Sequence, residues 1–283
     1  RIFPSCGKCA MADLARMSIN QATTREQHGL AQAITAYARA GVPGISIWRD
    51  KLAACGLDEA VRMVGDTGLQ VSGLCRAGQF PALDATRRQT ILDDNKVAVD
   101  EAAALGADCL IMVAGGLPEG SKDLAGARQM VLDGLGALLP HARANRVPLA
   151  IEPLHPMYAA DRCVINSLGQ ALDLCDELGA GVGVAVDVYH LWWDPDLQAQ
   201  IGRAGERVLA FHVCDWLVPT TDLLLDRGMM GDGVIDIPKI REWVDATGYD
   251  ALIEVEIFSV HNWWKRPGGE VVSTCLERFS SYV

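Results

Sequence analysis

Short apolar runs alternate along the chain with longer segments in which apolar residues recur every three or four positions. Short runs rich in Val, Ile and Leu are typical of strands that are buried on both faces. The chain contains eight of these runs. We therefore predict strands at residues 16–20, 44–48, 70–75, 108–114, 148–152, 182–187, 208–213 and 251–256.

The longer segments predict amphipathic helices. Leu30, Ile34 and Tyr37 recur at helical spacing, and so do the apolar residues between 131 and 139. Several of these segments end in a glycine just before the next strand, for example Gly106. Glycine commonly ends a helix because it adopts the left-handed conformation without strain.

The order of the elements predicts the fold class. Strands that alternate with helices form parallel sheets, and eight such units in a chain of this length predict one closed (β/α)8 barrel of the α/β class, a TIM barrel. No Pro/Ser-rich linker or low-complexity tract divides the chain. We therefore predict a single barrel domain at residues 16–283, preceded by an irregular extension at residues 1–15.

The charge balance argues against a nucleic-acid partner. The 283 residues include 36 Asp and Glu against 25 Lys and Arg, which gives a net charge of -11, whereas nucleic-acid surfaces need clustered positive charge. No apolar run approaches the roughly 20 residues needed to cross a bilayer, and the N-terminus lacks the pattern of a secretory signal. We expect a cytoplasmic protein that binds neither nucleic acid nor membrane.

The nine cysteines are odd in number and scattered, so they do not resemble a disulfide framework. Most are expected to be small buried apolar residues. Cys6 and Cys9 form a single CGKC motif, which is weak evidence for zinc without a second Cys or His pair nearby. We interpret this motif as part of the irregular N-terminal extension.

The ends of four predicted strands carry ionisable side chains. Active sites of such barrels lie at the carboxyl ends of the strands, and four consecutive strands end in or near Glu152, Asp187, His212 and Glu256. Each alone is best interpreted as a solvated loop start, a helix cap or a hydrogen-bonded histidine. Together, three carboxylates would repel one another and raise their pKa values unless a cation lies among them.

A divalent metal ion resolves this repulsion. Oxygen-rich ligands with one imidazole and no thiolate suit Mn²⁺ or Mg²⁺, with Co²⁺ or Zn²⁺ as alternatives. We therefore predict one divalent ion per chain. A metal held in this way acts as a Lewis acid on a carbonyl and its neighbouring hydroxyl.

Five motifs carry a family resemblance: LAIEPLHP around Glu152, DVYHLWW with Asp187, FHVCDW with His212, GDGVIDI, and IEVEIF with Glu256. From about Met17 onward, the chain resembles the xylose isomerase-like TIM barrels. Within them it is most similar to the sugar phosphate isomerase/epimerase group, which is related to ketose 3-epimerases and inosose isomerases. The order of the motifs is specific to this superfamily but not to one reaction.

The resemblance implies a mechanism and a substrate class. Glu152, Asp187, His212 and Glu256 would bind the metal, and His190 would contact a small sugar or polyol substrate. Glu152 and Glu256 would move a proton through a cis-enediolate, which gives either an epimer or an aldose–ketose isomer. The prediction leaves open whether the protein forms a homo-oligomer.

Two arginines are further candidates for substrate binding. Arg227, in the loop DLLLDRGMMGDG, resembles a family arginine that contacts substrate hydroxyls or a phosphate, and a solvated surface arginine is an equal alternative. Arg76 follows the third predicted strand and would bind an anionic substrate group or pair with a loop carboxylate.

Glu254 lies two residues before Glu256 and so faces the same side of the strand, but deeper, where it needs hydrogen-bond partners.

Proteins with other functions share this fold and this arrangement of ionisable residues at the carboxyl end of the barrel. An inosose- or dehydroshikimate-type dehydratase would use the same metal site and proton abstraction, followed by loss of water. An apurinic-site endonuclease is a remote alternative, because it needs more zinc ligands and a basic surface while this chain has six His and is acidic. A non-catalytic sugar-binding barrel would be indicated if no metal bound.

Overall fold

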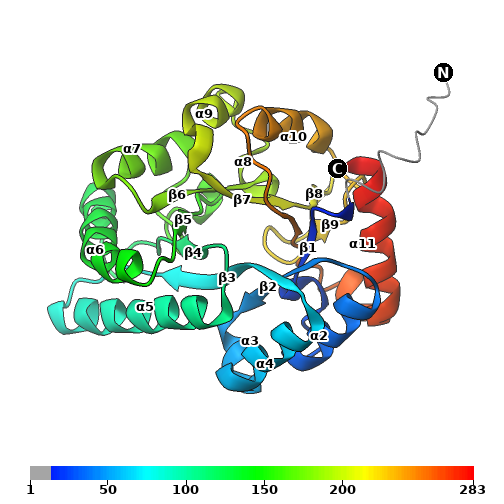
Figure 1. The fold of residues 1–283 in the computed structure, drawn as a ribbon. Helices are drawn as coiled ribbons and strands as arrows, with labels where there is room; N and C mark the ends of the chain where they lie inside the picture. The colour runs from blue at the N-terminus through cyan, green and yellow to red at the C-terminus, as the bar shows by residue number, and fades with distance from the viewer. Residues whose placement is uncertain (1–13) are drawn as a thin grey trace.

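The structure is a computed structural model that describes residues 14–283 (Figure 1). Eight parallel strands close into a barrel, in the spatial order β1, β10, β7, β6, β5, β4, β3, β2. The strands are β1 (Met17–Asn20), β2 (Gly44–Trp48), β3 (Gln70–Gly78), β4 (Leu110–Val113), β5 (Leu149–Ile151), β6 (Val182–Asp187), β7 (Val208–Val213) and β10 (Ile253–Val255).

Helices surround this barrel and connect its strands, as Figure 1 shows. Helices of eight or more residues are α2 (Leu30–Arg39), α4 (Leu57–Thr67), α5 (Ala85–Leu105), α6 (Leu124–Ala144), α7 (Leu168–Leu178), α9 (Leu197–Ala204), α10 (Ile237–Asp245) and α11 (Gly268–Tyr282). The shorter ones are α3 (Arg49–Cys55), α8 (Val188–Leu191), η1 (Gln21–Thr24), η2 (Pro156–Tyr158), η3 (Gly205–Arg207) and η4 (Trp263–Lys265).

The observed architecture confirms the predicted (β/α)8 barrel. Each predicted strand coincides with an observed one to within a few residues. The predicted extension at residues 1–15 lies almost entirely outside the described residues, and so do Cys6 and Cys9. The seven described cysteines are free thiols, and six of them are buried, as expected of small apolar side chains.

Local sequence explains why the elements form where they do. Helix α2 buries Leu30, Ile34 and Tyr37 against the barrel and leaves polar residues outside, so its apolar stripe determines its orientation. Ser167 is the N-cap of helix α7. Its hydroxyl accepts from the backbone N–H of Gln170, and this bond replaces a missing intrahelical bond. Every residue of β6 is buried, because helices cover the outside of the barrel.

A short antiparallel hairpin, absent from our sequence prediction, follows β7. It pairs β8 (Asp215–Trp216) with β9 (Arg227–Gly228). The Asp215 carboxylate accepts hydrogen bonds from the backbone N–H groups of Gly231, Gly233 and Ile235, at 2.8 to 3.0 Å. A Cβ atom on Gly233 would lie 2.1 Å from the Trp216 carbonyl oxygen, so this turn requires glycine. The turn thereby fixes the loop that carries Arg227.

No helix within residues 14–283 has both the length and the apolar character that a membrane span requires.

Candidate functional site

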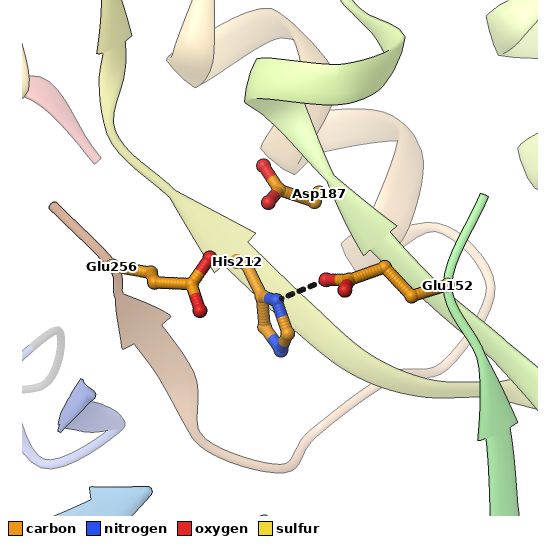
Figure 2. Close-up of side chains that lie close together, drawn as sticks. All are labelled: Glu152, Asp187, His212 and Glu256. Atoms are coloured by element: carbon orange, nitrogen blue, oxygen red, sulfur yellow. Dashed lines mark hydrogen bonds and ion pairs between the residues drawn. The ribbon is translucent and has the colours of Figure 1, made fainter. Parts of the chain in front are cut away.

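Four ionisable side chains converge at the carboxyl end of the barrel (Figure 2). Glu152 follows β5, Asp187 ends β6, His212 lies in β7 and Glu256 follows β10. These strands are neighbours in the barrel, and one ligand atom from each residue lies within 4.8 Å of the others. All four are buried. The structure therefore brings together the four side chains that the sequence singled out.

Asp187 both caps a helix and faces the site. Its Oδ1 accepts from the backbone N–H of Tyr189 at 2.7 Å and so caps the short helix α8. Its Oδ2 lies 3.4 Å from Arg227 Nη1 and 3.7 Å from His190 Nε2. Burial alone would raise the pKa of Asp187, but its surroundings, which include the Arg227 guanidinium and the backbone N–H of Tyr189, outweigh burial and lower it. Asp187 is therefore an ionised carboxylate with one oxygen directed at the site.

His212 lies between two glutamates. Its Nδ1 is 3.0 Å from Glu152 Oε1, and its Nε2 is 3.6 Å from Glu254 Oε1. Burial lowers the pKa of His212, but the carboxylates of Glu254 and Glu152 outweigh that effect and raise it well above its ordinary value. The imidazole holds a proton in the metal-free protein. A cation would displace that proton, because a ligating nitrogen must present a free lone pair.

Glu256 is the carboxyl group whose charge is least favoured. Burial raises its pKa to about 8, with Arg227 acting against the increase and the nearby Glu152 adding to it. Arg227 Nη1 donates to Glu256 Oε2 at 2.9 Å. A carboxyl group that titrates near neutral pH is suited to giving and taking protons during catalysis.

Arg227 is buried inside the site, which excludes the alternative of a solvated surface arginine. Its backbone N–H donates to the Phe258 carbonyl at 2.8 Å, which ties β9 to the segment after β10. Its guanidinium carbon lies over the rings of Tyr189 and Phe258, 4.3 and 4.8 Å from their centroids. Two aromatic faces and two carboxylates thus hold one cationic side chain beside Glu256.

His190 is buried and uncharged. Its Nδ1 accepts from the backbone N–H of His155 at 3.3 Å, so the ring proton is assigned to Nε2, which faces Asp187 Oδ2. Burial lowers the pKa of His190 to about 3, and the raising effect of Asp187 does not offset this. His190 therefore offers a neutral N–H donor to the site, as its predicted contact with a substrate oxygen requires.

A cavity of about 390 Å³ opens above these residues. Glu152, Glu256, His190 and Arg227 line its buried inner end. Arg76, which lies in β3, also lines this cavity, as the sequence predicted for a rim residue. The remaining lining residues are Arg25, Glu26, Trp48, Cys75, Val113, Leu154, Tyr158, Arg162, Leu224, Leu225, Phe258 and Trp264.

Several lining residues escaped the sequence analysis. Arg162, Tyr158 and Trp264 lie in loops or short 3-10 helices, where no periodicity indicates the direction of a side chain. Their only sequence signal is proximity to a strand end that carries a candidate ligand. Of the tryptophans near strand ends, Trp48 lines the cavity, while Trp216 packs against Tyr189 with ring centroids 4.7 Å apart.

Glu254 is deeply buried and fully partnered, as its position in the strand demanded. Its Oε1 accepts from Asn20 Nδ2 at 2.6 Å, and its Oε2 accepts from the Ser72 hydroxyl at 2.9 Å. Asn20 Nδ2 also donates to Glu256 Oε1 at 2.9 Å. Glu254 therefore belongs to a hydrogen-bonded layer directly beneath the candidate ligands.

The donor set fits a divalent cation. Metal–oxygen and metal–nitrogen bonds are about 2.0 to 2.2 Å long, so ligands on opposite sides of an ion are separated by little over 4 Å, close to the observed 4.8 Å. Arg227 pairs with Asp187 and Glu256, and a bound ion would balance the charge that appears when the protons of His212 and Glu256 are displaced. A buried Glu/Asp/His cluster of this kind could hold a metal ion, with Glu152, Asp187, His212 and Glu256 as its donors.

The chain belongs to the xylose isomerase-like TIM barrel family, whose sequence model matches residues 34–275. This confirms the resemblance inferred from the motifs. Among curated proteins, none matches the chain.

Solved structures extend this comparison. Protein SMc04130 from Sinorhizobium meliloti 1021 is 61% identical, with a TM-score of 0.94 over 94% of this chain and 98% of that one. The IOLI protein, whose structure holds a zinc atom, is 20% identical, with a TM-score of 0.81 over 95% and 99% of the two chains. D-psicose 3-epimerase from Clostridium cellulolyticum H10 is 16% identical, with a TM-score of 0.76 over 95% and 99%. The last two similarities concern the fold.

The contacts of Glu254 predict a stability effect. Glu254→Gln removes the negative charge that lies 3.6 Å from the protonated His212 ring. If the new amide oxygen keeps its bond from Asn20, the Ser72 hydroxyl must reverse from donor to acceptor and lose its present arrangement. We expect a loss of about 1 to 3 kcal/mol in the free energy of unfolding, measured by urea denaturation. Glu277→Gln, at an exposed position of α11, is the control and should change little. An unchanged midpoint for Glu254→Gln would contradict this account.

Proposed function

We propose that this protein is a divalent-metal-dependent isomerase or epimerase that moves a proton on a carbon next to the carbonyl of a small sugar or polyol-derived substrate. The observation that carries the proposal is the convergence of Glu152, Asp187, His212 and Glu256. Glu152 and Glu256 of this group line the inner end of a cavity large enough for such a molecule. The D-psicose 3-epimerase named above, which shares the fold, supports the same class of reaction.

The metal ion, when bound, supplies positive charge beside the substrate oxygens on which enolate charge develops. Figure 2 shows Glu152 and Glu256 on opposite sides of His212, reaching in from β5 and β10. Two carboxylates placed in this way would act from the two faces of a planar enediolate. One removes a proton from carbon, and the other returns a proton.

His190 and Arg227 would bind the substrate oxygens. The His190 ring is uncharged at neutral pH, and its Nε2–H can donate to a hydroxyl or carbonyl oxygen. Arg227 already contacts Glu256 through Nη1, which keeps that carboxylate in one orientation. Its second terminal nitrogen, Nη2, lies 3.4 Å from His190 Nε2, so both groups face the same part of the cavity.

The path of the proton decides the product. If the proton leaves one face and returns to the other, the product is an epimer; if it is passed between adjacent carbons, the product is an aldose–ketose isomer. The test is an NMR screen in D₂O of ketoses, their phosphates, inososes and keto acids with the metal-loaded protein. We expect deuterium at a carbon next to a carbonyl. No exchange with any of these substrates, at full metal occupancy, would refute the proposed reaction.

The first prediction concerns the metal. We expect about one divalent ion per chain by elemental analysis, because the four donors define one site. Asp187→Ala removes one metal donor and leaves Arg227 with a single carboxylate partner. The affinity of the protein for the metal should therefore fall at least tenfold. His190→Ala is the matched variant, because it alters a neighbouring buried side chain, in α8, without removing a metal donor. It should keep the metal and lose turnover; equal metal loss in both variants would contradict the assignment.

The second prediction concerns Glu256. Glu256→Gln removes the acid/base group but keeps its shape, so we expect solvent deuterium exchange to fall at least a hundredfold. Melting temperature and circular dichroism should remain those of a folded barrel. Glu277→Gln should retain full exchange. Near-wild-type exchange in Glu256→Gln would assign the proton transfer to another residue, with Glu254 the next group along the strand.

The third prediction follows from the raised pKa of Glu256. In the metal-free protein the folded state holds more protons than the unfolded state between pH 4.5 and about 8. The free energy of unfolding should therefore decrease as pH rises through that window. Metal affinity should increase over the same range, by about tenfold per pH unit for each proton displaced. Melting curves and metal titrations at several pH values test both trends, and Glu256→Gln should reduce both slopes.

A further inference from the structure

The ligand carboxylates and two arginines, Arg76 and Arg162, lie in different parts of the site. The carboxylates of Glu152, Asp187 and Glu256 come from β5, β6 and the end of β10. Arg76 comes from β3, and Arg162 comes from the loop that follows η2. Both arginines line the solvent-exposed outer part of the cavity, as do Arg25 and the exposed Glu26. Glu152 and Glu256 line its buried inner end, and Asp187 is buried beside them.

Backbone contacts place Arg162 on the same side of the cavity as Arg76. The loop before and after Arg162 is hydrogen-bonded to residues 115–117, through Leu117 N–H to the Ala160 carbonyl at 2.8 Å and Val164 N–H to the Gly115 carbonyl at 2.9 Å. Residues 115–117 follow β4, and β4 pairs directly with β3. The two arginines therefore project from adjacent parts of the rim.

Glycine allows this close packing. A Cβ atom on Gly116 would lie 2.5 Å from the carbonyl carbon of Asp161 and 2.8 Å from the backbone nitrogen of Arg162. The loop that carries Arg162 thus rests directly on the segment after β4. Its position is set by backbone contact and not by the arginine side chain alone.

A bound divalent ion and Arg227 would together balance the three ligand carboxylates at the inner end, while Glu254 beneath them is held by Asn20 and Ser72. Three carboxylates carry three negative charges there, and Arg227 with the ion supplies three positive ones. The arginines of the outer part are therefore not required to balance the catalytic carboxylates.

The outer arginines differ in how far they are already neutralised. Arg25 is engaged, with Asp50 at 3.0 Å and its guanidinium over the ring of Trp48. Arg162 has one long ion pair, 3.5 Å to the exposed Asp161, and its guanidinium carbon lies 5.7 Å from the centroid of the Tyr158 ring. Arg76 makes no hydrogen bond or ion pair with any of residues 14–283. Donors at the mouth of a cavity thus remain free for a ligand.

We propose that the substrate carries an anionic group, a carboxylate or a phosphate, at the end remote from its reacting carbonyl, and that Arg76 and Arg162 bind this group. The proposal rests on the proposed function, because it takes the inner carboxylates as the place of reaction. A guanidinium offers parallel N–H donors that match two oxygens of a carboxylate or phosphate. Trp48 and Trp264 would cover the carbon chain between the two ends.

The test is direct binding to the metal-loaded protein by calorimetry, with three probes that share a carbon skeleton: D-fructose, D-fructose 6-phosphate and D-fructuronate. We expect at least one of the two anionic probes to bind ten or more times tighter than fructose. The ratio between phosphate and carboxylate identifies which anion the site prefers. Failure of both anionic probes to bind at millimolar concentration, or binding no tighter than fructose, would overturn the proposal.

Variants locate the anion site. Arg76→Gln and Arg162→Gln should each reduce the affinity for the anionic probe about tenfold and leave metal content and fructose affinity unchanged. Arg39→Gln, in the last turn of α2 at the opposite end of the barrel, is the control and should bind as the wild type does. An equal loss for neutral and anionic probes, or no loss in either rim variant, would refute the assignment.

The binding assay separates this proposal from the proposed reaction. If no substrate exchanges deuterium but the anionic probes keep their arginine-dependent advantage, the reaction is wrong and the anion site stands. If exchange occurs equally well with neutral ketoses and is insensitive to Arg76→Gln and Arg162→Gln, the reaction stands and the anion site is wrong.

Discussion

Mutual repulsion among three buried carboxylates is the constraint that shapes the site. Glu152, Asp187 and Glu256 approach one another at the inner end of a closed barrel, where little water is available to screen them. Burial raises the pKa of Glu256 to about 8 and the charge of Glu152 adds to the increase, so protonation of Glu256 removes one of the charges. Arg227 is a second response, and a divalent ion would be the third.

Placing Arg227 among these carboxylates requires much of the surrounding loop structure. The guanidinium reaches Glu256 because β9 is paired with β8 on one side and bonded to the Phe258 carbonyl on the other. The hairpin in turn depends on Asp215, whose two oxygens accept backbone N–H groups from the following turn. A carboxylate outside the catalytic group thus determines where the compensating charge lies.

Much of this site could be predicted from sequence because a parallel barrel has one simple rule. All strands run in one direction, so a residue at the end of any strand lies at the same rim. Apolar runs therefore identified the strands, and the polar residues that end them identified Glu152, Asp187, His212 and Glu256. Period-two alternation also indicated that Glu254 shares a face with Glu256 at greater depth, and its partners Asn20 and Ser72 agree.

The loops follow no such rule. Arg162 lies in a loop and Trp264 in the short 3-10 helix η4. The direction of Arg162 depends on contacts far away in sequence, such as the packing of residues 160–162 against Gly116. The hairpin β8–β9 was missed for a related reason. Its strands have two residues each, too short for any alternation to be visible. Arg227 was a candidate only through family resemblance, because its burial depends on the tertiary placement of that hairpin.

Asn20 connects the acid/base group to the wall of the cavity. Its Nδ2 donates to both Glu254 and Glu256, while its Oδ1 accepts from the indole N–H of Trp48 at 2.8 Å. The carboxyl group of Glu256 and the ring of Trp48 are therefore held by the two ends of one amide. The two glutamates determine the orientation of the Asn20 amide, because they can only accept hydrogen bonds. If the amide were reversed, its N–H groups would face the indole N–H of Trp48. A molecule that displaces Trp48 would therefore remove one of the contacts that orient Asn20, and Asn20 in turn contacts the carboxyl group that we propose as the acid/base group.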